Sequence, residues 1–116
     1  MKRPLPSDPA EQRLAVLQKL RIVIRAAQQH SAWIEKQCGV SGAQLWIMQE
    51  LHEHGGMRVG ALARALAIHQ TTTSNLLDTL VKRALVRKDA DPDDRRAVVV
   101  SLTAAGAALL ATAPRP

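Results

Sequence analysis

DPDDRRAVVVSLTAAG, residues 91–106, places three aspartates and two arginines directly before a β-branched run. Alternating apolar residues make 97–102 a strand, and residues 85–88 form a second strand on the other side of the charges. The two strands predict a β-hairpin with its densest charge at the tip. Thr103 can then cap a final helix over residues 104–112 through its hydroxyl.

Two short helices precede the hairpin. Residues 60–68, GALARALAI, form the first, and residues 70–83 form the second, with a tight connection at Ile68 and His69. A second helix that is polar on its outer face is typical of a helix-turn-helix. With the charged hairpin directly behind it, this unit predicts a winged helix, a mostly helical α+β fold with a two-stranded wing. The inward stripe of the second helix consists of Thr73, Leu76, Leu77 and Leu80.

The N-terminal part divides into an arm and a long helix. Residues 1–9 contain three prolines and predict a flexible arm, and residues 10–38 predict one helix. An apolar face this broad implies burial against a partner as well as against the chain itself, so we expect a dimerisation helix. The apolar side chains that leave little polar surface on its first half are Leu14, Val16, Leu17, Leu20, Ile22, Val23 and Ile24.

A capping box marks the start of the next helix. Ser41 and Gln44 have the spacing at which each side chain satisfies the other's free backbone amide. We therefore expect the winged helix-turn-helix domain over residues 41–103. Residues 104–116 are expected to begin a C-terminal helical region that is shortened to a single helix.

The amino-acid composition limits the classes of partner that the chain is expected to bind. The chain has 116 residues, enough for one domain, and 16 Lys and Arg against 10 Asp and Glu give a net charge of +6. This balance favours a polyanionic partner, either nucleic acid or an anionic membrane surface. The chain has two Trp and no Phe or Tyr, so it lacks the stacking rows that hold single-stranded nucleic acid. A protein that binds the backbone of double-stranded DNA needs no such rows.

Patterns for catalysis or metal binding are missing from the sequence. An enzyme needs a nucleophile with a base, or a metal cluster, and neither is visible. His52 and His54 flank Glu53, but positions two apart point about 200° apart on a helix, so no metal site is predicted. Cys38 lies on the apolar stripe, which favours an inert thiol. We predict no enzymatic activity and no cofactor. In the absence of a signal peptide or long apolar run, we expect a cytoplasmic protein.

Several segments together resemble the MarR family of bacterial transcription regulators. The match covers Val59–Ala63 in the first short helix, Thr71–Leu80 in the recognition helix, Lys82–Val86 at its exit, Asp94–Arg96 at the wing tip and Leu102–Gly106 in its return. The family commonly has Gly where this chain has Ala84. The resemblance implies a homodimeric repressor that binds a palindromic operator and is released by a small phenolic or anionic effector. It also implies further C-terminal helices, which this sequence lacks.

The outer face of the recognition helix and the wing tip carry the expected DNA contacts. The amide of Asn75 can bond N6 and N7 of adenine together, at about 1–3 kcal/mol of discrimination. Arg95 and Arg96 fit the minor groove, and an ion pair with Asp94 would hold Arg96 extended. Asp78 is expected to pair with a cation or to face a cytosine amino group. The predicted DNA-binding residues are Gln70, Thr71, Thr72, Ser74, Asn75, Lys82, Arg87, Arg95 and Arg96.

The sequence also provides candidates for an effector site and leaves one alternative function. The family binds effectors between its first two helices and its DNA-binding lobe, which makes four residues the candidates here: His30, Trp33, Trp46 and Arg64.

The alternative to a regulator is a winged-helix module for protein assembly, without specific DNA binding and with an incidental basic surface. It would be favoured if Asn75 and Arg96 proved dispensable while the first helix did not. A membrane-surface role fits least, because the first helix lacks a clean Lys/Arg face.

Overall fold

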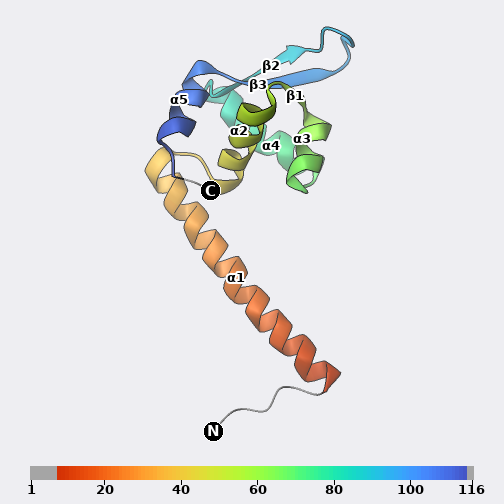
Figure 1. Cartoon of the computed structure of the whole chain (residues 1–116), viewed down its shortest axis with the longest axis vertical. Helices are drawn as coiled ribbons and strands as arrows, with labels where there is room; N and C mark the ends of the chain where they lie inside the picture. Colours follow the sequence, from red (N-terminus) through yellow and green to blue (C-terminus); the bar gives the residue numbers. More distant parts are fainter. Residues whose placement is uncertain (1–7, 115–116) are drawn as a thin grey trace. The chain divides into compact units, whose positions relative to one another are not determined.

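The structure is a computed structural model that describes residues 8–114. Residues 1–7, most of the predicted N-terminal arm, lie outside the described residues. The described chain contains five helices and three strands, labelled in Figure 1. By its internal contacts the chain divides into two compact units, Met1–His30 and Ser31–Pro116.

The first unit is formed by the N-terminal part of α1, a helix that spans Pro9–Cys38 in all. The carboxylate of Asp8 accepts a hydrogen bond from the amide of Ala10 at 3.2 Å. Pro9 occupies the first helical position, where its missing amide hydrogen is not needed. The helix therefore begins one residue earlier than predicted. The large apolar side chains between Leu14 and Ile24 are 46–69% exposed, so the predicted apolar face is open within the single chain.

The helices of the second unit surround one apolar core. They are α2 (Gly42–His54), α3 (Val59–Leu66), α4 (Gln70–Lys82) and α5 (Ala104–Thr112). The predicted capping box is confirmed: the Ser41 hydroxyl accepts from the Gln44 amide at 3.2 Å, and the Gln44 side chain accepts from the Ser41 amide at 2.9 Å. The first short helix ends two residues earlier than predicted, because Ala67 turns left-handed at φ 55° and closes α3.

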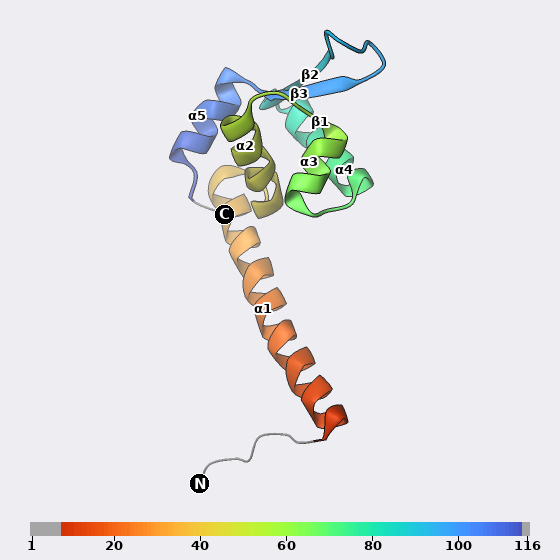
Figure 2. The same cartoon turned by 45° about the vertical axis from the view of Figure 1, so that its right-hand side comes forward.

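A three-stranded antiparallel sheet completes the winged helix. Its strands are β1 (Met57–Arg58), β2 (Val86–Ala90) and β3 (Val98–Leu102), in the order β1-β3-β2. The hairpin of β2 and β3 confirms the predicted wing, and Figures 1 and 2 show its loop extending beyond the helices. Strand β1 was not predicted. Leu85 was predicted to start the first wing strand, but its amide bonds the Leu80 carbonyl at 3.0 Å and closes α4 instead.

The turn from β3 into α5 gives a physical reason for Thr103 and Gly106 in the segment Leu102–Gly106. The Thr103 hydroxyl accepts from the Gly106 amide at 3.0 Å, as predicted for a cap, and donates to the Ala84 carbonyl at 2.7 Å. A Cβ atom at Gly106 would collide with the carbonyl oxygen of Leu85 and with the Leu102 side chain. Glycine is therefore required where α5 crosses the end of α4.

The core draws on every helix and on the hairpin. Gln44, which is 7% exposed, adds a polar link, because its side-chain amide donates to the Leu76 carbonyl of α4 at 3.2 Å. No helix of the described part of the chain is long and apolar enough to span a membrane. Of the predicted inward stripe of α4, Thr73, Leu77 and Leu80 are fully buried and Leu76 is half-buried. The buried apolar core side chains are Ile34, Val40, Leu45, Ile47, Met48, Leu51, Leu62, Leu77, Leu80, Leu85, Val86 and Val100.

Candidate nucleic-acid interface

The outer face of α4 is exposed along its length. Thr73, Leu77 and Leu80 are fully buried, which turns the opposite face of the helix to solvent. Of the nine residues predicted to bind DNA, Ser74 is half-buried and the other eight are exposed. The predicted contact residues are therefore accessible, and those on α4 form a polar surface of mostly uncharged hydrogen-bonding side chains.

The N-terminus of α4 has free backbone donors. His69 occupies the N-cap position, but its side chain makes no capping hydrogen bond. The hydroxyl of Thr73 donates to the His69 carbonyl at 3.0 Å, so it does not act as an acceptor for the first amides of the helix. Amides at a helix N-terminus have no partner inside the helix and attract anions such as phosphate. The local structure therefore favours a phosphate contact beside Thr71 and Thr72.

Two ion pairs connect the charged residues at the base of the wing. Lys88 of β2 lies 3.5 Å from Asp78 of α4, and Arg87 lies 3.1 Å from Asp89 on its own strand. The pairing of Asp78 with a cation confirms one of the two alternatives expected for that residue. It also reduces the repulsion that a bare carboxylate on α4 would exert on phosphate.

Backbone hydrogen bonds shape the wing tip. The Asp91 amide donates to the Ala97 carbonyl and the Ala97 amide to the Asp94 carbonyl, each at 2.9 Å. The Asp91 carboxylate accepts from the Asp93 amide at 2.9 Å, and the Asp94 carboxylate accepts from the Arg96 amide at 3.1 Å. These contacts are typical of aspartates in turns. They correct the predicted ion pair of Asp94 with Arg96: the Asp94 carboxylate binds the backbone amide of Arg96 rather than its guanidinium, because the loop is a turn and not an extended segment.

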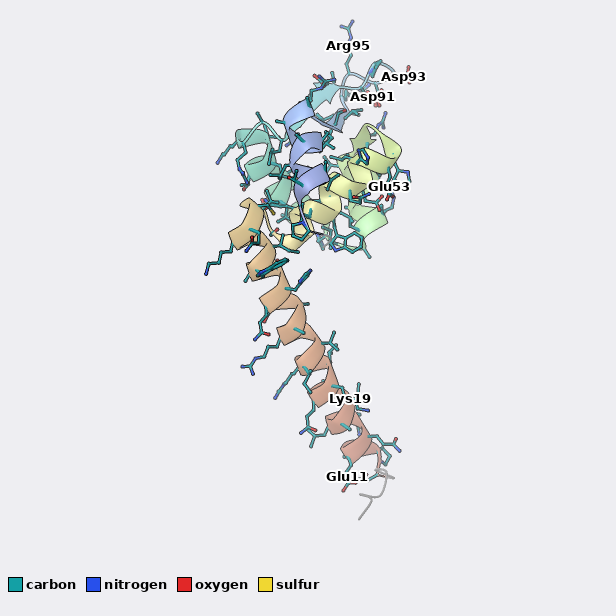
Figure 3. The ribbon with its side chains drawn as sticks, turned by 60° about the vertical axis from the view of Figure 1, so that its left-hand side comes forward. Glu11, Lys19, Glu53, Asp91, Asp93 and Arg95 are labelled. Carbon is teal, nitrogen blue, oxygen red and sulfur yellow. The ribbon has the colours of Figure 1, made fainter. Side chains whose placement is uncertain are left out.

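A long-range ion pair joins the wing to β1. The Nε and Nη2 atoms of Arg58 lie 2.9 and 2.7 Å from the same carboxylate oxygen of Asp91, whose side chain is only 13% exposed. The Asp93 amide and the Arg58 guanidinium together lower the pKa of Asp91, and the hydrogen bond to Asp91 raises the pKa of Arg58. Both groups are therefore charged at neutral pH. In Figure 3, Arg95 projects outward from the tip near Asp91 and Asp93.

Arg58 was missed by the sequence prediction. It is separated from Asp91 by 33 positions, and the strand that carries it has two residues. A strand this short shows no alternation of polar and apolar residues. The one local signal was the position of Arg58 just before a helix, which says nothing about the wing.

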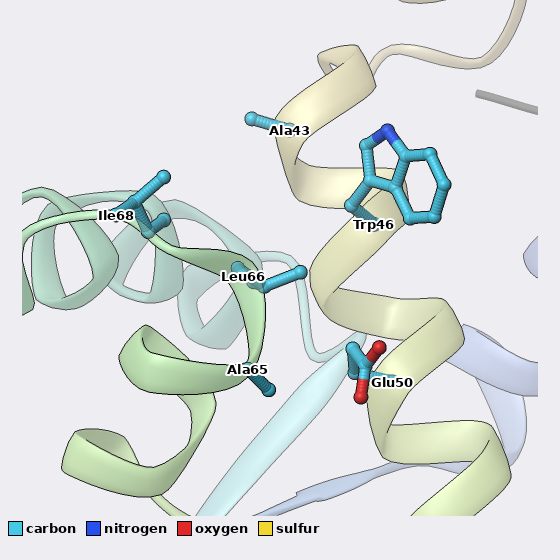
Figure 4. A pocket seen from close by; sticks show the side chains of 6 residues that line it. All are labelled: Ala43, Trp46, Glu50, Ala65, Leu66 and Ile68. Carbon is cyan, nitrogen blue, oxygen red and sulfur yellow. The ribbon is translucent and has the colours of Figure 1, made fainter.

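A pocket of about 310 Å³ lies between α2 and the end of α3 (Figure 4). Trp46, one of the predicted effector residues, lines it, whereas Trp33 and Arg64 do not. His30 belongs to the first unit. Glu50 supplies the one charged side chain among the described lining residues, which are Ala43, Trp46, Glu50, Ala65, Leu66 and Ile68.

Glu50, Glu53 and His54 form a polar cluster on the last turns of α2, with one potential metal-ligand atom of each within 4.8 Å of the others. His54 lies 3.2 Å from Glu50, and Gln49 donates to Glu53 at 2.9 Å. The cluster is largely exposed and its members are paired with one another or with Gln49. Exposed acidic groups of this kind are common without a bound ion.

A helix-turn-helix with an attached two-stranded wing defines the class of winged-helix proteins. The sequence model of the MarR family matches residues 40–98, and the chain belongs to the MarR family of transcriptional regulators. Its named relatives are regulators rather than enzymes, in agreement with the prediction of no enzymatic activity.

The relatives and solved structures match this chain over only part of their own length. The HTH-type transcriptional repressor NicR of Pseudomonas putida is 36% identical over 89 residues, which are 74% of this chain and 56% of NicR. The chain thus spans little more than half the length of that relative. A probable transcriptional regulator from Pseudomonas aeruginosa is 32% identical with a TM-score of 0.68, over 78% of this chain and 71% of that one. The S. aureus MepR–DNA complex is 26% identical with a TM-score of 0.65, over 79% and 76%.

Proposed function

We propose that the chain is a cytoplasmic transcriptional repressor that binds a palindromic operator in double-stranded DNA as a homodimer and is released by a small-molecule effector. The observation that carries this proposal is the exposed polar face of α4 with an uncapped N-terminus, next to a wing with two exposed arginines. A helix of this kind enters the major groove while a wing follows the backbone toward the minor groove. One relative of known structure, MepR of S. aureus, has been solved as a complex with DNA.

The exposed side chains divide into base readers and backbone contacts. Asn75 is assigned to adenine through its amide, whereas Gln70, Thr71, Thr72 and Ser74 surround the free amides at the start of α4 and hold phosphate or a thymine methyl. Lys82 and Arg87 extend this surface along the DNA backbone. Arg95 and Arg96 bind in the minor groove, where the negative potential is strongest.

The exposed apolar side chains of the first unit support a homodimer. One helix carries seven large apolar residues that are about half exposed or more. So many exposed apolar side chains are unusual for a soluble monomer and mark an interface. A two-fold dimer presents two α4 helices, so its operator has two half-sites in inverted repeat, about one helical turn of DNA apart. Residues 10–38 are thus proposed to supply the dimer contact, and residues 41–103 the DNA contact.

Selection from a pool of random-sequence duplexes of about 30 base pairs tests this proposal, since that length holds two half-sites. The 116-residue chain is expected to enrich an inverted repeat and to have the mass of a dimer in the same buffer. Enrichment of no sequence, together with an assembly that depends on the first helix but not on Asn75 or Arg96, would instead favour a protein-assembly module.

The pocket beside Trp46 is the proposed effector site. Its lining is apolar except for Glu50, so it favours a small aromatic ligand that is neutral or cationic over the phenolic or anionic effectors that the family resemblance implies. Two matched aromatic probes, one with an amidinium and one with a carboxylate, separate these classes. In the Trp33→Phe variant, Trp46 is the sole indole, and its fluorescence should respond to the amidinium probe alone. A response to the carboxylate probe alone would contradict the assignment.

A further inference from the structure

We infer that Arg58 is a positioning residue: its ion pair with Asp91 fixes the wing relative to the helix-turn-helix and so sets where Arg95 and Arg96 meet DNA. The consequence for DNA binding rests on the proposed function. The consequence for the order of the wing does not, and it can be measured without DNA.

The strand order shows why this contact acts across the sheet. Val99 of the central strand β3 pairs with Arg58 on one side and with Asp89 on the other. Directly paired residues project from the same face of an antiparallel sheet, and so does Asp91, two positions beyond Asp89. The Arg58 side chain therefore crosses β3 and reaches Asp91, the residue directly after β2, where the wing loop begins.

Arg58 also belongs to the helix-turn-helix. It is the last residue of β1 and the N-cap of α3, so its backbone is fixed by the helix while its side chain holds Asp91. Among the ion pairs of residues 8–114, the other wing contacts are made by Arg87 and Lys88 at the base of the hairpin. The Arg58–Asp91 pair is the one that reaches the loop from outside the hairpin.

The two carboxylate oxygens of Asp91 accept hydrogen bonds from different partners. One accepts the Asp93 amide and forms the turn, and the other accepts both Arg58 donors. Loss of Arg58 therefore leaves the turn intact but releases it from β1. A released wing must be ordered when DNA binds, which weakens binding by about three- to tenfold for a loop and side chain of this size.

Variants that remove a positive or a negative charge distinguish a positioning role of Arg58 from its direct contact with phosphate. If Arg58 bound phosphate itself, Arg58→Ala would weaken binding and lower the salt slope by about one, whereas Asp91→Asn would free the arginine and tighten binding. If Arg58 acts through the wing, both variants weaken binding. Asp91→Asn suits this test because the amide oxygen of asparagine still accepts from the Asp93 amide.

The experiment measures binding of the 116-residue chain and its variants to a duplex that the wild-type chain selects from random sequence. Arg58→Ala and Asp91→Asn are each expected to bind about three- to tenfold more weakly. The double variant should be no weaker than Arg58→Ala, since one interaction is lost in all three. Arg58→Lys retains the charge but not the fork of donors and should lie between. Asp93→Asn, which removes the same charge from the same loop, is the control and should bind at least as tightly as wild type.

A second measurement on the free chain keeps the two proposals separate. Arg58→Ala and Asp91→Asn should speed hydrogen exchange of the Arg96 and Ala97 amides, while Asp93→Asn leaves it unchanged. Absence of DNA binding by the wild-type chain would refute the proposed function, and the exchange rates would still decide the role of Arg58. Tighter binding by Asp91→Asn, or unchanged exchange in both variants, would overturn the inference.

Discussion

Replacement of Gly106 by alanine tests the packing of α5 against the end of α4. The added Cβ would collide with the backbone carbonyl oxygen of Leu85 and would lie 2.7 Å from the Leu102 Cδ1 atom. A side chain can rotate away from such a collision, but a backbone carbonyl between α4 and β2 cannot. Overpacking of a core typically costs about 1–3 kcal/mol, and the upper end applies to a backbone collision. Alanine has a better helix propensity than glycine, which raises the unfolding free energy by about 1 kcal/mol.

The net loss expected for Gly106→Ala is about 2 kcal/mol of unfolding free energy, or roughly a thirtyfold fall in the ratio of folded to unfolded chains. Urea unfolding followed by far-ultraviolet circular dichroism measures it, and the midpoint should fall by about 1 M. Gly60→Ala is the matched control, because its Cβ would meet only side-chain atoms at 3.7 and 3.8 Å. That variant should be as stable as wild type or slightly more stable. A Gly106→Ala chain that unfolds at the wild-type midpoint would refute the packing argument.

Three further changes have expected outcomes that unfolding or exchange experiments can check. Ala84 has a left-handed φ of 56°, so Ala84→Gly should raise the unfolding free energy by about 0.5–1 kcal/mol, and a lower urea midpoint would contradict this. Gln44→Glu keeps an acceptor for the capping box but loses the donor to the Leu76 carbonyl, so it should lower the unfolding free energy at pH 7 by about 1–3 kcal/mol. The pKa of Asp91 is lowered from 3.8 by the Asp93 amide and the Arg58 guanidinium, so its stabilising effect is complete above that value and is lost as the pH falls through the lower folded-state pKa. Protection of the wing amides should therefore hold from pH 8 to pH 5 and fall only below about pH 4.

The sequence was informative wherever a few neighbouring residues determine the structure. The capping box of Ser41 and Gln44, the inward stripe of α4 and the cap at Thr103 are all set within three or four positions, and the structure confirms each. The hairpin was predicted for the same reason, because its strands and its charged loop are consecutive. The recognition-helix residues follow from the stripe, since an inward face determines the outward one.

Local sequence patterns could not predict contacts between residues that are far apart in the chain. The Arg58–Asp91 pair and the Gln44–Leu76 hydrogen bond join residues 33 and 32 positions apart. Neither can be inferred until the register of the sheet and the packing of α2 on α4 are known. The same applies to the pocket, where Trp46 was proposed from the family's usual site but its neighbour Glu50 was not.

The predicted role of Asp94 shows how a correct residue can receive the wrong partner. Positions 94 and 96 lie on the same side of an extended segment, which suggested a pair of side chains. The loop instead turns, and the carboxylate reaches the Arg96 amide. Aspartate commonly bonds the backbone two residues on, and this competes with ion pairing wherever the chain is free to turn.

The most direct test of the central claim is a salt titration of DNA binding by the 116-residue chain and two of its variants. The wild-type chain should bind its selected duplex as a dimer, with a steep fall in affinity as salt rises. Arg96→Ala should weaken binding to all sequences about equally and flatten the slope by about one, and Asn75→Ala should relax the preference at one base pair of each half-site. Equal loss of sequence preference in both variants, or weak and sequence-blind binding by the wild-type chain, would contradict the account.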